Sequence, residues 1–240
     1  MAYYGISARN DGQRAAISAL MNDKPLLFLT GPAGTGKTLI TQAVGLHRLT
    51  DAQDFRKMMY TRMQTQVGVD LGFLPGDLHE GKTYPFMRPF LDNLDAMAPA
   101  AKQTYHYLTS GGEDKRRLFF DPIQTMRGGS FLHTFVITDE SQNLDPHVIG
   151  TIATRPSTGT KIVFLGNFAQ IDDERLRKPE TNGLYRLLSG LYEVGAHEYF
   201  DHVNLTEVQR HPVVDVVERI LRNHDMPVEF AELEARGNVG

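Results

Sequence analysis

Eight consecutive residues have the types and spacing needed to bind the phosphates of a nucleotide. They are Gly31-Pro32-Ala33-Gly34-Thr35-Gly36-Lys37-Thr38, and they fit the pattern G-x-x-x-x-G-K-[ST] without a mismatch. The backbone N–H groups of such a glycine-rich loop point inward, and the N-terminus of the helix that follows favours negative charge. We therefore predict an ATP-binding loop in which Lys37 reaches the β- and γ-phosphates and the Thr38 hydroxyl holds Mg²⁺.

Two carboxylates offer the second half of the chemistry that ATP hydrolysis needs. Asp139 and Glu140 follow the apolar run Phe135-Val136-Ile137-Thr138. Asp139 can hold the water shell of Mg²⁺ beside Thr38, and Glu140 can orient and deprotonate the attacking water. An apolar strand also ends in an acidic residue when the chain simply exits into solvent, but the loop upstream favours the catalytic interpretation.

Two glutamines complete the predicted site. Gln170 follows the apolar run Lys161–Leu165 and is expected to contact the γ-phosphate and to sense its loss. Gln13 precedes the phosphate-binding loop, where a glutamine reads the adenine edge in several helicase-like ATPases. The alternatives are an ordinary loop glutamine for Gln170 and a solvated helix residue for Gln13.

These residues must be positioned by strands that alternate with helices. The apolar patterns predict strands at Leu26–Thr30, Lys57–Thr61, Leu118–Asp121, Thr134–Thr138, Lys161–Leu165 and His202–Thr206. They predict helices at Gln13–Met21, Lys37–Leu49, Tyr84–Met97, Lys102–Thr109, Pro146–Ala153, Gly183–Leu191 and Pro212–Asn223. This alternation indicates a three-layer α/β fold with a mostly parallel sheet, whose ligands bind at the carboxyl ends of the strands. The tail 224–240 either docks as a short helix or frays.

The composition is that of an ordinary soluble protein. The 240 residues carry a formal net charge of −4, and 41% of them are hydrophobic, so we expect a single domain over 1–240. The absence of cysteine excludes disulfides, cysteine-ligated zinc and thiol catalysis. No apolar run reaches the length of a membrane span, and the N-terminus lacks the pattern of a signal peptide. We therefore expect a cytoplasmic protein with no membrane partner.

Several further segments carry a family resemblance. In chain order they are Tyr60-Thr61-Arg62, the run 67–78, Tyr84-Pro85-Phe86-Met87-Arg88-Pro89, Met126-Arg127-Gly128, Asp139-Glu140-Ser141-Gln142-Asn143, Thr154-Arg155 and Gln209-Arg210-His211-Pro212. With these motifs, the chain from Gln13 to Arg222 resembles the PhoH-like family of phosphate-starvation-induced ATPases. The core of that family is similar to the first RecA-like domain of superfamily 1 helicases. The resemblance implies a P-loop NTPase fold, ATP and Mg²⁺ as cofactors, and a homo-oligomeric ring of six subunits.

One residue departs from the family pattern. The family usually has Gly-Asp where this chain has Gly166-Asn167. Asparagine keeps the size and the hydrogen-bonding reach of aspartate but loses its charge, so we expect an altered turnover. Because the pair Asp139-Glu140 is intact, we still predict an ATPase.

Two arginines are candidates for neutralising charge in the transition state. With one core in each chain, such an arginine most simply comes from a neighbouring subunit. Arg155, which follows the helix after Asp139-Glu140, is our candidate for this contact in trans. Arg210 is our candidate for a contact with the γ-phosphate in its own subunit. A surface ion pair is the alternative for each arginine.

RNA or single-stranded DNA is the expected partner of such a ring. Thr61 and Arg62 lie at a predicted strand end, where helicase-type relatives contact a single-strand backbone. Arg88 adds a cation among aromatic residues, a combination that single-strand binding uses. A packing loop at a subunit interface is an equal alternative for the run 71–89.

The leading hypothesis is therefore a helicase-like ATPase that acts on RNA or single-stranded DNA. A small-molecule kinase is one rival, although Glu140 and Gln170 fit water activation better. A GTP switch would need the guanine-reading motif N-K-x-D, which is absent. Nucleotide-controlled assembly without turnover is the remaining rival, and Asn167 keeps it open.

Overall fold

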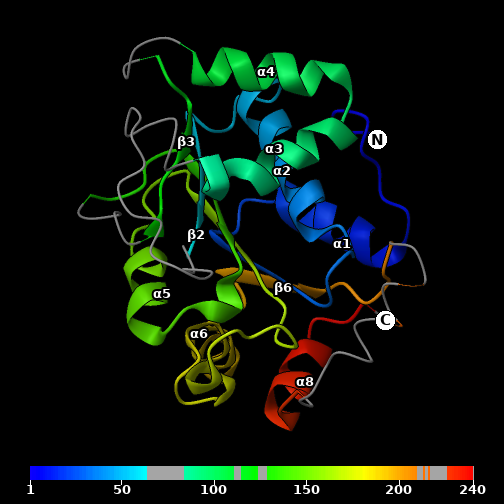
Figure 1. Ribbon diagram of the computed structural model, residues 1–240. Coiled ribbons are helices and arrows are strands. Elements are labelled where there is room, and N and C mark those ends of the chain that lie inside the picture. The colour runs from blue at the N-terminus through cyan, green and yellow to red at the C-terminus, as the bar shows by residue number, and fades with distance from the viewer. Residues whose placement is uncertain are drawn as a thin grey trace, which may run out of the picture.

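A six-stranded parallel sheet forms the centre of the computed structural model (Figure 1). The structure describes residues 1–63, 84–110, 115–123, 129–209, 213, 216 and 226–239. The strand order is β3-β2-β4-β5-β1-β6, and neighbouring strands in it pair in parallel. In chain order the strands are β1 (Leu26–Thr30), β2 (Lys57–Arg62), β3 (Leu118–Phe120), β4 (Thr134–Asp139), β5 (Lys161–Leu165) and β6 (Phe200–Asn204).

Helices cover both faces of this sheet, as Figure 1 shows. One face carries α1 (Asp11–Met21), α2 (Lys37–Thr50), α3 (Tyr84–Ala96) and α4 (Pro99–Thr109). The other face carries α5 (Pro146–Ala153), α6 (Gly183–Glu193) and α8 (Val228–Ala235). Two short 3-10 helices, η2 (Ser141–Asn143) and η3 (Glu174–Arg177), follow β4 and β5. The predicted three-layer α/β architecture is therefore confirmed, with a mostly parallel sheet as its middle layer.

Alternation along the strands explains how one sheet serves two hydrophobic cores. In β1, Leu27 and Leu29 belong to the core under α1–α4, whereas Leu26 and Phe28 belong to the core under α5, α6 and α8. Every residue of β1, β4 and β5 is buried, which is expected of parallel strands covered on both faces. These buried central strands end where the candidate site begins.

A few boundaries differ from those predicted. Helix α1 begins before Gln13 because the Asn10 side chain caps it by accepting from the Gln13 N–H. Strand β6 begins at Phe200 rather than His202, since it pairs with β1 from that residue onward. The predicted helix 212–223 falls almost entirely outside the described residues.

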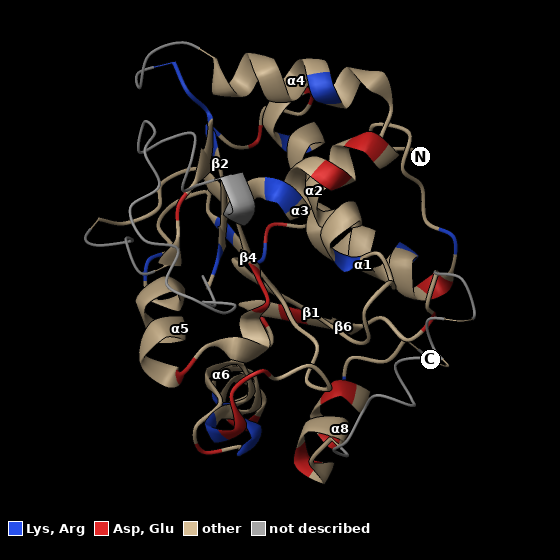
Figure 2. Cartoon of the chain, viewed as in Figure 1, with Lys and Arg blue, Asp and Glu red and all other residues tan. Residues whose placement is uncertain are grey.

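The C-terminal tail docks as helix α8, which is rich in acidic residues (Figure 2). The ring of Phe230 is fully buried and stacks on that of Phe168, with ring centroids 4.8 Å apart. Leu233 is buried in the same core. None of the helices in the described ranges is long and apolar enough to cross a membrane.

Candidate nucleotide-binding site

The phosphate-binding loop joins the end of β1 to the start of α2. Gly31 and Gly36 have φ angles of 116° and 91°, a region that other residues rarely adopt. A Cβ atom at Gly31 would also collide with the carbonyl oxygen of Leu205. Gly36 forms the N-cap of α2 without a side-chain cap, so the N-terminus of α2 faces the loop with its backbone N–H groups. These features are those of an anion site at a helix N-terminus.

Lys37 folds back onto the loop that precedes it. Its Nζ donates to the carbonyl oxygens of Gly31 at 2.6 Å and Pro32 at 2.8 Å. The Thr35 hydroxyl donates to the same Pro32 oxygen at 3.0 Å, and the N–H of Gln209 donates to the Gly34 carbonyl at 2.9 Å. The loop is thus shaped by internal bonds, and a triphosphate would have to draw the Lys37 ammonium away from its carbonyl partners.

A cavity of about 590 Å³ lies beside this loop, at the carboxyl ends of the central strands. It gathers predicted site residues from five separate segments of the chain: Gln13, Ala33, Gly34, Gly36, Lys37, Thr38, Arg62, Asp139, Glu140 and Gln170. The gathering follows from the strand order, because β5 separates β4 from β1 and all three strands end at the same edge. The carboxylates therefore face the phosphate-binding loop across one cavity.

Asp139 is held by two donors inside the protein. The Tyr60 hydroxyl donates to its Oδ2 at 2.6 Å, and the Glu140 N–H donates to its Oδ1 at 3.1 Å. Burial and the charge of Glu140 raise the pKa of Asp139, and the Tyr60 bond and the charge of Arg62 oppose that rise. Burial also raises the pKa of Tyr60, well above its ordinary value. Each carboxylate oxygen keeps a second lone pair for a water of a bound cation.

The donors in this cavity suit Mg²⁺ bound together with phosphates. Thr38 and Asp139 both line it, and both present oxygen atoms, the ligands that Mg²⁺ prefers. Within the described ranges, no three His, Asp or Glu side chains form a group that could hold a metal alone. A magnesium ion here would therefore depend on phosphate oxygens and water for most of its coordination.

Glu140 is connected to the loop after β5 through Gln142, a residue for which no role was predicted. The Gln142 Nε2 donates to Glu140 Oε2 at 2.6 Å and to the Gln170 carbonyl at 3.0 Å. Its Oε1 accepts from the N–H of Asn167 at 3.1 Å, and its side chain is fully buried. Glu140 itself has a φ of 53°, a left-handed conformation that non-glycine residues hold only where the surroundings enforce it. This turn brings the side chain of Gln142 back toward Glu140.

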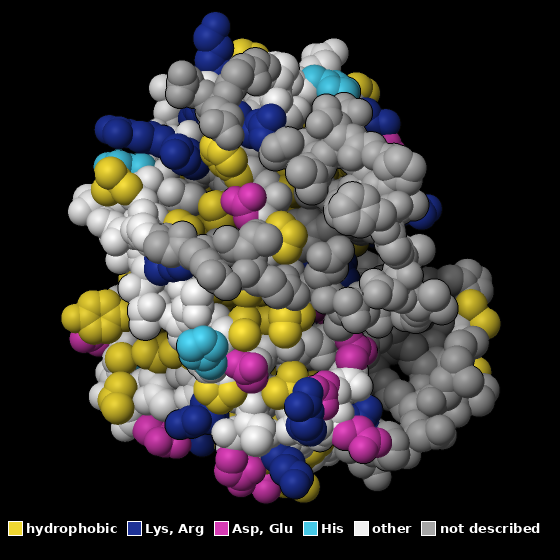
Figure 3. All heavy atoms as spheres, turned by 60° about the vertical axis from the view of Figure 1, so that its left-hand side comes forward, with side chains coloured by type: hydrophobic (Ala, Val, Ile, Leu, Met, Phe, Trp, Pro, Cys, Tyr) yellow, Lys and Arg dark blue, Asp and Glu magenta, His cyan; other side chains and the backbone are white. Residues whose placement is uncertain are grey.

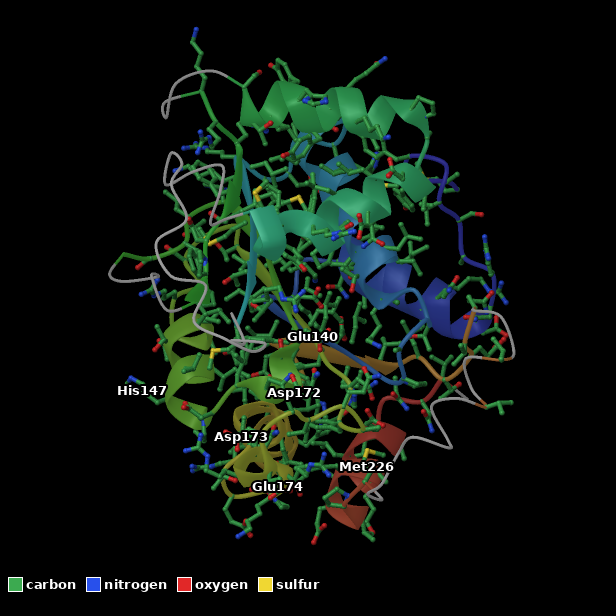
Figure 4. The ribbon with its side chains drawn as sticks, viewed as in Figure 1. Glu140, His147, Asp172, Asp173, Glu174 and Met226 are labelled. Atoms are coloured by element: carbon green, nitrogen blue, oxygen red, sulfur yellow. The ribbon has the colours of Figure 1, made fainter. Side chains whose placement is uncertain are left out.

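A second pair of bonds ties the same two loops together. The Asn143 amide donates to Asp172 Oδ2 at 2.8 Å, and its Oδ1 accepts from the Asp172 N–H at 2.9 Å. Figure 4 shows Glu140 and Asp172 close to each other, with Asp173 and Glu174 farther along the same loop. Desolvation, and then the charge of Glu140, raise the pKa of Asp172. The loops that follow β4 and β5 thus form one bonded unit.

The two predicted glutamines lie at the cavity in different ways. Gln13 is buried, with its Nε2 donating to the Thr35 carbonyl at 2.9 Å and its Oε1 accepting from the Arg9 N–H at 2.9 Å. It therefore ties α1 to the phosphate-binding loop, and its adenine contact stays a prediction that would use the remaining N–H and lone pair. Gln170 is exposed and lines the cavity, where its sensing of the γ-phosphate also stays a prediction.

The residues predicted to contact nucleic acid differ in their surroundings. Thr61 is fully buried and its hydroxyl donates to the Asp121 carbonyl at 2.6 Å, so the structure does not favour the predicted contact there. The contact of Thr61 with nucleic acid stays a prediction. Arg62 lines the nucleotide cavity instead, close enough to oppose the rise in the pKa of Asp139. Arg88 is exposed on α3 and pairs with Asp92 at 3.9 Å.

The two predicted arginines also differ in place. Arg155 follows α5, which returns from the carboxyl end of β4 toward the amino end of β5. Its carbonyl accepts from the Phe131 N–H at 2.9 Å and its guanidinium lies 5.7 Å from the Phe131 ring centroid. Arg155 therefore lies at the amino ends of the strands, whereas the phosphate-binding loop of the same chain lies at their carboxyl ends. Arg210 lies outside the described residues.

A family model and similar curated sequences point to one family. A family model described as PhoH-like protein matches residues 5–222. Protein PhoH2 of Bacillus subtilis is 35% identical over 202 residues, which make up 78% of this chain and 45% of that protein. A PhoH-like protein of the same organism is 34% identical over 212 residues, or 87% of this chain and 61% of that protein. The chain thus spans about half of the first relative and three fifths of the second.

Solved structures show the fold at low sequence identity. The large terminase of bacteriophage HK97 has a TM-score of 0.53 at 11% identity, over 95% of this chain and 43% of that chain. The large terminase of a thermophilic bacteriophage has a TM-score of 0.50 at 11% identity, over 90% of this chain and 51% of that chain. At such identities the likeness is one of fold alone.

Proposed function

This chain belongs to the PhoH-like protein family of P-loop ATPases, and on that premise we propose that it hydrolyses ATP with Mg²⁺ and acts on RNA or single-stranded DNA. The observation that carries the hydrolytic part is the meeting of Lys37, Thr38, Asp139 and Glu140 in one cavity. A loop that binds phosphate needs only the first two. The buried aspartate and the oriented glutamate across from them are what hydrolysis adds.

The residues of this cavity would divide the reaction among them. The loop N–H groups and the Lys37 ammonium bind and orient the triphosphate. The Thr38 hydroxyl and, through water, Asp139 would hold Mg²⁺, which would supply positive charge to the phosphate oxygens. Glu140 positions a water in line with the γ-phosphorus and accepts its proton, while the bond from that phosphorus to the β–γ bridging oxygen breaks. ADP and inorganic phosphate leave.

The bond from Gln142 explains how Glu140 could be kept ready for this role. Gln142 occupies Oε2 of the carboxylate, which leaves Oε1 for the water. The same amide donates to the carbonyl of Gln170, the predicted γ-phosphate sensor. The water-activating group and the sensing loop would therefore move together when phosphate leaves.

The proposal also includes a ring of identical subunits and a nucleic-acid partner. Arg155 at the amino ends of the strands would serve a neighbour's nucleotide, because it is across the sheet from its own. On the face seen in Figure 3, described Lys and Arg side chains are interspersed with acidic ones, so nucleic acid would be bound locally rather than by the whole surface. Exposed Arg88 is a candidate for such a local contact. A cytoplasmic location remains a prediction from the sequence.

Steady-state ATP hydrolysis tests this proposal directly. Turnover would be measured with Mg²⁺ for the wild type, Lys37→Ala and Glu140→Gln, each with and without single-stranded RNA or DNA. Lys102→Ala is a matched control, because Lys102 is an exposed lysine of α4 that pairs with Asp95. The proposal would be supported if Lys37→Ala and Glu140→Gln lose turnover, Lys102→Ala keeps it, and nucleic acid stimulates the wild type. Tight ATP binding without turnover would instead favour nucleotide-controlled assembly.

A further inference from the structure

One buried donor at the cavity has no hydrogen-bond partner among the residues that the structure describes. It is the Nδ2 of Asn167, whose residue is only 5% exposed. Asn167 follows β5 and lines the cavity together with Lys37, Glu140 and Gln170. A buried N–H without an acceptor carries a desolvation penalty, so a partner at this place would stabilise it.

The orientation of this amide follows from its neighbours. The Asn167 Oδ1 accepts from the backbone N–H of Ala169 at 3.1 Å, and a backbone N–H can only donate. The oxygen therefore faces Ala169 and the Nδ2 faces away from it. The backbone N–H of Asn167 is also fixed, because it donates to Gln142 Oε1. Only the Nδ2 is left for a ligand.

The sheet order places this donor between the two halves of the site. Strand β5 pairs with β1 on one side and with β4 on the other. The phosphate-binding loop follows β1, and Asp139 and Glu140 end β4 and begin the turn after it. A group at the end of β5 is therefore placed where the terminal phosphate of a nucleotide on the loop would approach the carboxylates.

We propose that the Asn167 Nδ2 donates to an oxygen of the terminal phosphoryl group of a nucleoside triphosphate and so makes the site prefer triphosphate to diphosphate. This inference rests on the proposed function, since it assumes a nucleotide on the loop. An aspartate, which the family usually has here, offers acceptors only and would repel the same oxygen. The amide thus changes the chemistry of this position from accepting to donating.

Calorimetric titration with ADP and with the β,γ-imido analogue of ATP, in Mg²⁺, tests the proposal without turnover. Asn167→Asp keeps the Oδ1 that accepts from Ala169 and changes only the donating atom. Asn167→Ala removes the whole amide. We expect each variant to lose about tenfold to a hundredfold in affinity for the triphosphate analogue, which is the range for a hydrogen bond to a charged group. The affinity for ADP should stay within about twofold of the wild type.

Asn238→Ala is the matched control, because Asn238 bonds to Asn204 and does not line the cavity. Melting curves would show whether each variant is folded. If Asn167→Ala is unfolded, the affinities of Asn167→Asp alone test the inference. An unchanged ratio of the two affinities, or an equal loss for both ligands, would overturn the inference even if the wild type hydrolyses ATP. A wild type that prefers triphosphate through Asn167 but hydrolyses nothing would uphold the inference and overturn the hydrolytic proposal.

Discussion

The hydroxyl of Tyr60 donates to Oδ2 of Asp139 at 2.6 Å, across the paired strands β2 and β4. Tyr60 lies opposite Ile137 in the register of these strands, and Asp139 is two residues farther along the same face. Tyr60 is fully buried, in contact with the ring of Phe90, whose centroid is 5.5 Å from its own. A side chain packed so firmly fixes the rotamer of the carboxylate that is predicted to serve Mg²⁺.

Tyr60→Phe should therefore weaken the Mg²⁺-dependent part of nucleotide binding. We expect the Mg²⁺ concentration for half-maximal binding of a fluorescent ADP analogue to rise several-fold, with metal-free binding unchanged, because only the orientation of Asp139 is lost. Tyr192→Phe is the control, since it also removes a hydroxyl bond, to His202 Nδ1 at 3.1 Å, and Tyr192 does not line the cavity. An unchanged Mg²⁺ dependence in Tyr60→Phe would show that Asp139 needs no such support.

Gln142→Ala should lower kcat while leaving the affinity for ATP nearly intact. The variant frees the Glu140 carboxylate and cuts its link to the loop after β5, so the loss appears in the chemical step. A fall of about tenfold to a hundredfold in kcat is expected from the loss of one hydrogen bond to a charged group. Gln103→Ala on the exposed face of α4 provides the comparison. If ATP affinity falls as much as kcat, Gln142 supports the loop as a whole rather than Glu140.

Gly31→Ala should destabilise the fold, whereas Gly190→Ala should not. At Gly31 the new methyl group meets the Leu205 carbonyl and the φ angle is unfavourable, so a loss of about 2 kcal/mol or more in the free energy of unfolding is expected. Gly190 lies inside α6 with open space around its Cβ position, and alanine there should stabilise the helix by about 0.5–1 kcal/mol. Urea unfolding measures both, and equal effects would contradict the steric argument.

Acidification should destabilise the protein partly through His202. Burial lowers the pKa of His202 to about 4 from its ordinary 6.5. Between these pH values His202 is protonated in the unfolded chain but neutral in the folded chain. The free energy of unfolding therefore falls as pH falls from 6.5 toward 4. The full shift corresponds to about 3 kcal/mol. His202→Gln should flatten this part of the curve, measured by denaturant unfolding at several pH values.

The control for that experiment is His106→Gln, because His106 is exposed on α4. Its curve should run parallel to that of the wild type. Should His202→Gln keep the wild-type slope between pH 6.5 and 4, burial of His202 would not be the source of the acid sensitivity. The buried Asp139 could not replace it, because a raised pKa favours the folded state as pH falls.

The sequence was sufficient to predict the loop, the carboxylate pair and the layers of the fold. Those features depend on neighbours in the chain, such as glycine spacing before Lys37 or an apolar run before Asp139. Tyr60 and Gln142 were not predicted as partners of the carboxylates. The first reaches Asp139 from 79 residues away, and the second only because Glu140 adopts a left-handed turn. The burial of Thr61 also depends on tertiary structure, since its hydroxyl donates to the carbonyl of Asp121, 60 residues away in the chain.

The docked tail also has a mechanical consequence. Phe168, which stacks on Phe230 of α8, is the residue next to Asn167 in the loop after β5. A movement of α8 must either carry Phe168 with it or break the stack. Because Asn167 lines the nucleotide cavity, helix α8 is connected to the lining of that cavity through a single neighbouring residue, Phe168.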